Sequence, residues 1–250
     1  MERGTILNRG AKVLDYARKV MIWQRLPKIR LKTPLFMLTG DMDDCSLSDR
    51  VFANLKIAKD HGLKYTVFLT PTPVERLHET VSVLHEFSAV VESHSFHVDH
   101  SKLRFNDQKK NFVESKELIE RCGHSVWGLR LPWLKWNRDT LKAAEPVYKF
   151  DSSVVIDQPS LARYRRMILV PITPPTDTYF IRRHFDSDTA LQKWKERAEQ
   201  VLSLNGVFTV LAHPANPMAD VLDKLISYVG SLGYRFTSPR ELVEGIAVED

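Results

Sequence analysis

Short runs of strand-forming residues alternate with amphipathic segments along most of the chain. Runs that are mostly apolar and too short for a helix are typical of strands buried on both faces. Strands that alternate with helices at this spacing predict about seven βα units and a parallel sheet. Strands are predicted at residues 35–39, 65–69, 89–93, 125–129, 153–155, 168–172 and 207–211. Helices are predicted from residue 48 to 61, from 73 to 84, and at 106–121, 137–144 and 219–229, with a further one around 191–198.

The N-terminal segment, residues 11–25, has the pattern of a basic amphipathic helix. Such a face usually packs on the core of its own protein, and this arrangement is the one we expect here. Contact with a membrane surface is the alternative. The chain is therefore predicted to consist of an N-terminal helix and connector, residues 1–33, and one barrel domain, residues 34–250. The apolar face has Val13, Leu14, Ala17, Val20, Met21 and Trp23, and the opposite face has Lys12, Arg18, Lys19 and Arg25.

Composition restricts the class of protein only mildly. A hydrophobic content of 43% in 250 residues is enough for a sizeable core, and the net charge of +5 is modest. No predicted strand interleaves basic and aromatic residues as an RNA-binding sheet does, so we expect no nucleic acid partner. Cys45 and Cys122 form no C-x-x-C motif, and the N-terminus lacks the uninterrupted apolar stretch of a signal peptide. A cytoplasmic location is therefore expected, and nothing in the sequence predicts the oligomeric state.

Side chains that can bind a metal or transfer protons follow three of the predicted strands. The carboxyl ends of parallel strands meet at one edge of a sheet, so these side chains are expected to converge. Carboxylates and imidazoles brought together in this way indicate a hydrolytic metal site. They are Asp41, Asp43 and Asp44 after the first strand, His94, His97 and His100 after the third, and His213 after the last.

Five short motifs occur along the chain in a fixed order. They are LTGDMDD at residues 38–44, ESHS at 92–95, GLRLPW at 128–133, the passage from WN at 136 to DSS at 151–153, and LAHP at 211–214. In order and spacing they resemble the T-F-D-D-G, H-[ST]-x-x-H, R-x-P-[YF], W-N-x-x-T-L to Y-D-S-S, and L-x-H motifs of polysaccharide deacetylases of the NodB-homology type, carbohydrate esterase family 4. The resemblance extends over about residues 34–244. It implies a distorted (β/α)7 barrel, here with an extra N-terminal helix.

The resemblance also implies an activity. A hydrolase of this family acts on carbon–nitrogen bonds other than peptide bonds and removes N-acetyl groups from an amino-sugar-containing glycan or glycoconjugate. One divalent metal, held by a carboxylate and two imidazoles, polarises the acetamide carbonyl and lowers the pKa of its bound water. A second carboxylate accepts the proton of the water, and a histidine protonates the leaving amine. Zinc is the favoured metal, although nickel, cobalt and iron suit the same ligands, and no other cofactor is expected.

Two registers of the aspartate cluster stay open. Asp41 as the base and Asp43 as the metal ligand is favoured, because alternate residues of a strand point the same way. This choice leaves Met42 where a strict alignment places the family's metal aspartate. A shift of two residues would instead make Asp43 the base and Asp44 the ligand.

The histidine cluster is irregular as well. His94 is predicted to be the first imidazole ligand, but Val98 stands where the family has the second. The second ligand is therefore His97, or His100 if two residues are inserted, and the residues that follow favour His100 slightly.

The remaining motifs supply the other site residues. The resemblance implies that His213 is the general acid, that Arg130 orients the base, and that Asp151 pairs with Arg130. Pro132, Trp133 and Leu211 are predicted to contact the substrate.

Two other functions are compatible with the sequence. The barrel could have lost its activity and serve as a carbohydrate-binding module, which the irregular histidine spacing and Met42 favour. The same fold and metal could instead serve a hydrolase of a non-sugar amide, as in the allantoinase-like relatives of the family.

Overall fold

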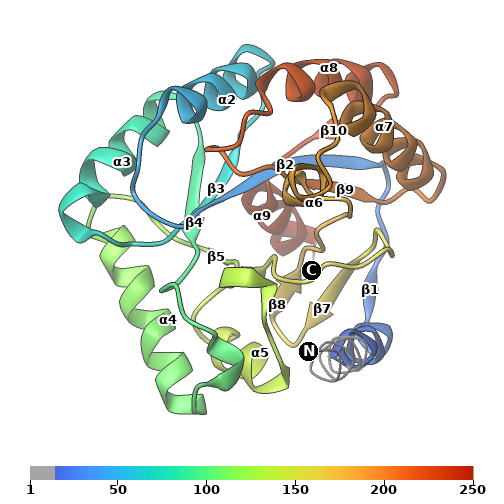
Figure 1. Cartoon of the computed structure of the whole chain (residues 1–250). Helices are drawn as coiled ribbons and strands as arrows, with labels where there is room; N and C mark the ends of the chain where they lie inside the picture. Colours follow the sequence, from blue (N-terminus) through green and yellow to red (C-terminus); the bar gives the residue numbers. More distant parts are fainter. Residues whose placement is uncertain (1–14, 250) are drawn as a thin grey trace, which may run out of the picture.

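A curled, mostly parallel sheet forms the centre of the molecule (Figure 1). The computed structural model describes residues 15–249. The order of the strands is β1-β7-β8-β6-β5-β4-β3-β2-β10, and β9 pairs with β2 outside this path. The strands are β1 (Lys28–Ile29), β2 (Leu35–Met42), β3 (Thr66–Leu69), β4 (Val90–Ser93), β5 (Gly128–Leu129), β6 (Phe150–Asp151), β7 (Leu161–Tyr164), β8 (Met167–Leu169), β9 (Val207–Leu211) and β10 (Arg235–Phe236).

Strand β2 is the axis of the sheet, and all eight of its residues are buried. Its first half pairs in parallel with β9 and β10, and its last four residues pair with β3. A strand with neighbours on both edges and helices outside it has no solvent face, which explains its unbroken apolar beginning. Two of its later residues, Thr39 and Asp41, are polar, and both are used in the site described below.

The barrel closes irregularly between β9 and residues 155–173. Within residues 155–173, Val155 and Ile172 form a single parallel bridge. The amide of Thr173 donates to the carbonyl of Thr209 at 3.0 Å, and the amide of Val207 donates to the carbonyl of Pro159 at 2.7 Å. Separate hydrogen bonds of this kind replace a regular ladder on this side. The fold is the predicted distorted barrel of βα units, which the structure confirms.

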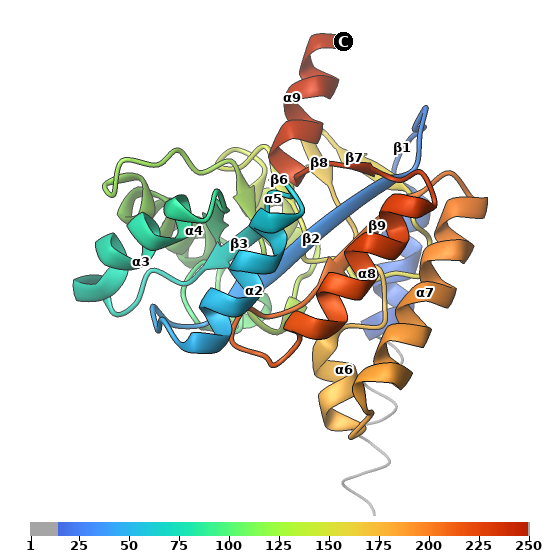
Figure 2. The same ribbon diagram turned by 90° about the horizontal axis from the view of Figure 1, so that it is seen from above.

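Helices cover the outside of the sheet (Figure 2). Polar side chains cap several of them: Ser48 accepts from the amide of Val51, and Asn137 and Thr140 form a reciprocal capping box. The longer helices place apolar stripes on the sheet, as their spacing predicts. The helices that follow the N-terminal one are α2 (Asp49–Asp60), α3 (Val74–Glu86), α4 (Phe105–Glu120), α5 (Arg138–Ala144), α6 (Asp177–Arg182), α7 (Ser187–Ser203), α8 (Ala219–Ser231) and α9 (Pro239–Glu249), with single 3-10 turns η1 (His100–Lys102) and η2 (Pro132–Leu134).

The region after α5 differs most from prediction. The strand expected at residues 153–155 lies at β6 instead, and Val155 contributes one isolated bridge. Strands β7 and β8 form an antiparallel hairpin that the sequence did not predict. Its turn contains Arg165 with φ of 54°, a conformation usually signalled by glycine or asparagine. Neither residue type stands at this turn, so the usual hairpin signal is missing.

The N-terminal helix occupies residues 15–24 of the described chain and packs on the barrel. Trp23 is fully buried in the core, and Val20 and Ile22 pack against the same cluster. Ala17 and Met21, predicted on the apolar face, are exposed, while Lys12, Val13 and Leu14 lie outside the described residues. The connector contributes β1, which pairs with β7. No helix within residues 15–249 has the length and apolar character needed to cross a membrane.

A buried ion pair fastens the last helix to the barrel. Glu92 of β4 is fully buried, and its carboxylate accepts from Nε of Arg240 at 2.8 Å and from Nη2 of the same residue at 2.7 Å. Its other oxygen accepts from the amides of Trp127 and Gly128, both at 2.7 Å. Burial nevertheless raises the pKa of Glu92, the effect of desolvation being larger than that of the Arg240 charge. Because the carboxylate is removed from water and Arg240 supplies its counter-charge, its ionised form depends on this arginine.

The variant Arg240→Met is expected to lower the free energy of unfolding by about 3 kcal/mol, because it leaves a buried carboxylate without its counter-charge. Urea unfolding followed by circular dichroism measures the change. Arg235→Met removes an exposed arginine from the neighbouring strand and should change the same quantity by less than about 0.5 kcal/mol. Equal midpoints for the two variants would show that the buried pair does not matter.

Candidate active site

The predicted site residues gather at the carboxyl ends of the central strands. Asp41 lies at the end of β2, His94 directly follows β4, and Arg130 directly follows β5. His213 follows β9 by two residues. The backbone hydrogen bonds of the sheet continue beyond the ends of the strands here. The amide of His94 donates to the carbonyl of Leu69, and the amide of Arg130 donates to the carbonyl of Ser93, both at 2.9 Å. The sheet thus fixes the positions from which these side chains project.

Asp41 is held by the fully buried guanidinium of Arg130. Nη1 of Arg130 donates to Oδ1 of Asp41 at 2.9 Å. Its Nη2 donates to the hydroxyls of Thr39 at 2.9 Å and Ser152 at 2.8 Å, and its Nε donates to the carbonyl of Ser152 at 2.9 Å. The guanidinium also stacks 4.1 Å from the ring centroid of Phe68. This arrangement fixes the carboxylate of Asp41 and leaves its second oxygen free to face the site.

Asp151 does not bond directly to Arg130, contrary to the predicted pairing. Its two oxygens accept from the amide and the hydroxyl of Ser153, both at 2.9 Å. The hydroxyl of Ser153 in turn accepts from the amide of Leu131 at 2.9 Å. Burial raises the pKa of Asp151 to about 6, against the opposing hydrogen bonds from Ser153 and the charge of Arg130. Asp151 therefore orders the backbone on both sides of Arg130 and acts on the guanidinium through its charge.

His213 lies between two carboxylates. Its Nδ1 is 2.9 Å from Oδ1 of Asp177, and its Nε2 is 3.9 Å from Oδ2 of Asp41. Asp177 is buried at the start of α6 and also accepts from the amide of His213 and from Asn216, both at 2.6 Å. Desolvation is the largest single influence on the imidazole and lowers its pKa, but the hydrogen bond and charge of Asp177 and the charges of Asp41 and Asp43 together raise it to about 9. The imidazole is therefore protonated at neutral pH.

Asp43 contacts two histidines. Its Oδ1 lies 3.4 Å from Nε2 of His94 and 3.2 Å from Nδ1 of His97. The hydrogen bond from His94 is the main cause of the lowered pKa of Asp43, against desolvation. Met42, between the two aspartates, is buried in the core, as expected from strand alternation. Asp44 accepts only a local hydrogen bond from the amide of Ser46 among the described contacts.

His100 lies apart from this group. Its Nε2 is 3.2 Å from the carbonyl of Phe96, and its ring packs 5.0 Å from that of Phe112. Burial lowers its pKa to about 4. Of the two alternatives for the second imidazole, His97 is the one that the structure places against Asp43. The slight preference of the sequence for His100 has no counterpart in these contacts.

Trp133 is the exposed member of the predicted substrate-contacting set. Its side chain is 55% exposed and lies edge-on to the ring of His97, with 4.3 Å between the centroids. Pro132 and Leu211 are buried, so neither offers a side chain to a substrate at the surface. Trp133 and Leu134 both have φ near +55° without being glycine, a conformation that costs about 1–2 kcal/mol per residue. This backbone conformation places the indole beside His97.

Gly40 allows the chain to pass closely beside the end of β9. A Cβ atom at this position would lie 2.7 Å from the hydroxyl of Tyr65 and 2.7 Å from Cδ of Pro214, and closer still to the carbonyl of Ala212. The hydroxyl of Tyr65 donates to that same carbonyl. This close packing sets the separation between Asp41 and His213.

Asp177 is the site residue that sequence reasoning missed. It lies 36 residues before His213, in a proline-rich stretch with no strand pattern. Its one local feature, an acidic residue that begins a short helix, is too common to indicate a catalytic site. Thr39 and Ser152, the hydroxyl partners of Arg130, were likewise not predicted as site residues.

Known structures share this fold. A Mycobacterium smegmatis protein with a provisional polysaccharide deacetylase assignment is 16% identical, with a TM-score of 0.74 over 89% of this chain and 94% of its own. A peptidoglycan N-acetylglucosamine deacetylase is 19% identical, with a TM-score of 0.62 over 86% of this chain and 90% of its own. A Bacillus anthracis protein described as a pseudoenzyme of carbohydrate esterase family 4 is 20% identical, with a TM-score of 0.64 over 87% and 68%. At these identities the likeness concerns the fold alone.

A search of curated protein sequences finds no match. The family model described as polysaccharide deacetylase matches residues 30–147, which include the aspartate cluster, the histidine cluster and Arg130. The motifs predicted this family from the sequence, and the model match and the fold agree. Over residues 30–147 the chain is therefore similar to the polysaccharide deacetylase family.

Proposed function

We propose that the protein is a metal-dependent hydrolase that removes N-acetyl groups from an amino-sugar-containing glycan or glycoconjugate. The observation that carries the proposal is the pair formed by Asp41 and His213. One is a carboxylate fixed by Arg130, and the other is an imidazole kept protonated by Asp177. A base and an acid whose facing atoms lie 3.9 Å apart are suited to proton transfer on both sides of one amide bond.

The residues near this pair fit a divalent cation in type and in pairwise spacing. Two ligand atoms about 2.1 Å from a common cation are separated by about 3.0–3.4 Å. The distances from Oδ1 of Asp43 to His94 and His97 are 3.4 and 3.2 Å. Within residues 15–249, however, no three His, Cys, Asp or Glu side chains converge as a ready-made metal site. Binding would thus require Asp43, which is half-exposed, to adjust between the two imidazoles.

Within the described part of the chain, the imidazole of His94 lacks a hydrogen-bond partner on one of its two nitrogens. Its Nδ1 is buried and has no hydrogen-bond partner among the described residues. Metal-bound histidines usually donate this second nitrogen to a carbonyl or carboxylate, and loss of such a partner weakens binding by about 10–100-fold. We therefore expect this site to bind zinc more weakly than a fully supported site of the same ligands.

The chain's own residues can carry the proton transfers. A cation held by Asp43, His94 and His97 would polarise the acetamide carbonyl and acidify a water. Oδ2 of Asp41, the oxygen not bonded to Arg130, accepts the proton of the attacking water. The protonated Nε2 of His213 donates to the amide nitrogen as its bond to the acetyl carbon breaks. The products are acetate and a free amine, and Asp177 keeps the imidazole oriented throughout.

Trp133 supplies an apolar surface beside the proposed metal ligands. Exposed aromatic rings commonly pack against the apolar faces of sugars and methyl groups. Its place next to His97 suits a sugar ring whose acetamide points toward Asp41. The exact glycan, and the cytoplasmic location expected from the sequence, stay predictions.

A binding protein without catalysis is the second candidate. It is favoured by the lack of a preassembled three-ligand group in the described chain. The intact arrangement of Asp41, Arg130, His213 and Asp177 opposes it, because a protein that only binds has no need for a fixed base and a charged acid.

The zinc-loaded wild type is expected to release acetate from N-acetylglucosamine oligomers. Asp41→Asn removes the base and should lower kcat by about 10²–10⁴-fold. Asp44→Asn, which affects only a local turn, should leave kcat within about twofold. Acetate release is measured by a coupled enzymatic assay. Failure of the metal-loaded wild type on every N-acetyl sugar would refute the deacetylase function.

Zinc titration of the metal-free protein by calorimetry is expected to give about one site, since one carboxylate and two imidazoles form one ligand set. Alanine at His94 or at His97 removes a ligand and should weaken binding by more than about 100-fold. His100→Ala should retain the site, since its ring contacts Phe112 and the carbonyl of Phe96 instead. Loss of zinc from the His100 variant, with retention in the His97 variant, would reverse the assignment.

In the metal-free protein, the imidazole of His213 is expected to titrate near pH 9, above its ordinary value of 6.5. Because the pKa is higher in the folded state than in the unfolded state, the protonated imidazole adds to the free energy of unfolding. The contribution, up to about 3 kcal/mol, is complete below about pH 6.5 and is lost as the pH rises through 9. Asp177→Asn should move the midpoint toward 6.5. Proton NMR of the imidazole measures the midpoint of the titration. Asp188→Asn, which removes an exposed aspartate, is the control. An unchanged midpoint in Asp177→Asn would contradict the assignment of Asp177 as the partner of His213.

A further inference from the structure

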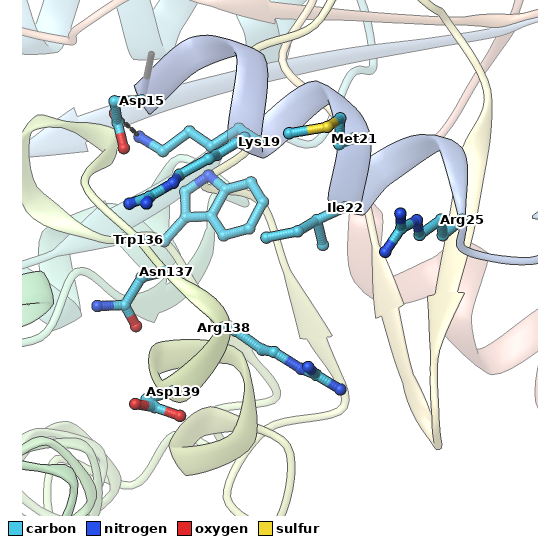
Figure 3. A pocket seen from close by; sticks show the side chains of 10 residues that line it. Asp15, Lys19, Met21, Ile22, Arg25, Trp136, Asn137, Arg138 and Asp139 are labelled. Atoms are coloured by element: carbon cyan, nitrogen blue, oxygen red, sulfur yellow. Dashed lines mark ion pairs between the residues drawn. The ribbon is translucent and has the colours of Figure 1, made fainter. Parts of the chain in front are cut away.

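A groove with three arginines lies between the N-terminal helix and the start of α5 (Figure 3). Arg18 and Arg25 belong to the N-terminal segment, and Arg138 is the first residue of α5. We call this the arginine groove; its volume is about 460 Å³. Figure 3 shows Arg25 and Arg138 on opposite walls. The helical wall precedes the residues matched by the family model, so the groove is built partly outside the part of the chain that the family defines.

The acidic residues of the groove do not neutralise these arginines. Asp15 pairs with Lys19 at 2.9 Å, and Asp139 pairs with Lys142 at 3.1 Å. The amide of Asn137 is used by the carbonyl of Ser101 and by the capping box of α5. None of the three arginines forms an ion pair with any residue in the described part of the chain. The basic side chains that line the groove outnumber the acidic ones, and an excess of positive charge in one concavity raises the local concentration of anions.

The floor of the groove is apolar. The indole of Trp136 is buried there, beneath the ammonium of Lys19 at 5.7 Å from the ring centroid. Ile22 is half-buried, and Met21 is 51% exposed at its side. A small inorganic anion would leave this surface uncovered. The groove therefore suits an anionic group attached to a less polar portion.

The groove and the candidate active site share one segment of chain. Trp136, on the floor, is three residues after Trp133, which lies against His97. Three residues of extended chain span at most about 11 Å. The ammonium of Lys19 also donates to the carbonyl of Leu134 between them, at 3.5 Å. A ligand of modest size can therefore extend from one to the other.

We propose that the arginine groove binds the phosphate or diphosphate group of a molecule whose N-acetylated sugar occupies the active site. Guanidinium groups bind phosphate oxygens through paired hydrogen bonds, and Arg is preferred over Lys where the geometry of the anion is read. A carboxylate offers fewer oxygens for three arginines on two walls. The anion site stands on the groove alone, whereas its link to the substrate rests on the proposed deacetylase function.

Calorimetry with inorganic pyrophosphate at low ionic strength tests the anion site in the full-length, metal-free protein. The wild type should bind it, and Arg25→Gln/Arg138→Gln should raise Kd by about tenfold or more. Arg50→Gln/Arg182→Gln removes two exposed arginines elsewhere, and so the same net charge, and should leave Kd within about twofold. No binding by the wild type, or equal losses in both double variants, would overturn the proposal.

Vesicles of phosphatidylcholine, with and without phosphatidylglycerol, identify the source of the phosphate. Sedimentation with the anionic vesicles alone, lost in Arg25→Gln/Arg138→Gln, assigns it to a lipid headgroup. Binding of pyrophosphate without binding of vesicles assigns the phosphate to a soluble molecule. In either case the arginine groove is a phosphate site.

The link to the substrate is tested by kinetics. For uridine diphosphate N-acetylglucosamine, the groove variant should lose kcat/KM by about tenfold, with no loss for uncharged N-acetylglucosamine oligomers. Equal losses for both substrates would overturn the link. Because pyrophosphate binding is measured without turnover, an inactive wild type that binds pyrophosphate refutes the deacetylase and not the anion site.

Discussion

The buried guanidinium of Arg130 is the interaction on which the site depends. A cation removed from water costs several kcal/mol unless its donors are satisfied, and here each nitrogen of the group has a partner. Those partners are residues of β2 and the residue just after β6, so one side chain ties together strands that are far apart in the sequence. As a result, the carboxylate of Asp41 is held rigidly at the sheet. Its Oδ1 accepts from Arg130, and its Oδ2 faces the site. A base on a mobile loop would have neither property.

Around this fixed carboxylate, the charges alternate in space. Arg130, Asp41, His213 and Asp177 follow one another as cation, anion, cation and anion, and each is held by its neighbour. Asp43 and its two histidines lie beside this row, and a cation bound there would require both imidazoles to be neutral. Protons would therefore compete with the metal at His94, His97 and Asp43, and not at Asp41. The arrangement separates the groups that would hold the metal from the groups that would transfer protons.

The sequence predicted the elements whose signals are local. The buried strands, the helix beginning near Asn137 and the common direction expected for Asp41 and Asp43 all follow from patterns over a few residues. The partner of His213 could not be predicted, because Asp177 reaches it only through the closure of the barrel. Asp151 was expected to contact Arg130, but its oxygens bond to Ser153, and Arg130 bonds to Ser152. The spacing alone left the choice between His97 and His100 open. In the structure His97 lies against Asp43, whereas His100 contacts Phe96 and Phe112.

Gly40 and the hydroxyl of Tyr65 lie in close contact. The hydroxyl of Tyr65, the residue before β3, fills part of the space that a side chain on β2 would take, and it donates to the carbonyl of Ala212 just after β9. The similar family motif has phenylalanine where this chain has Gly40. Here a Cβ atom at position 40 would also collide with the carbonyl of Ala212 and with Cδ of Pro214, so replacing Tyr65 alone would not make room for it. Position 40 is therefore closed to every side chain unless the turn after β9 moves as well, and descendants of this chain should keep glycine there for as long as they keep that turn.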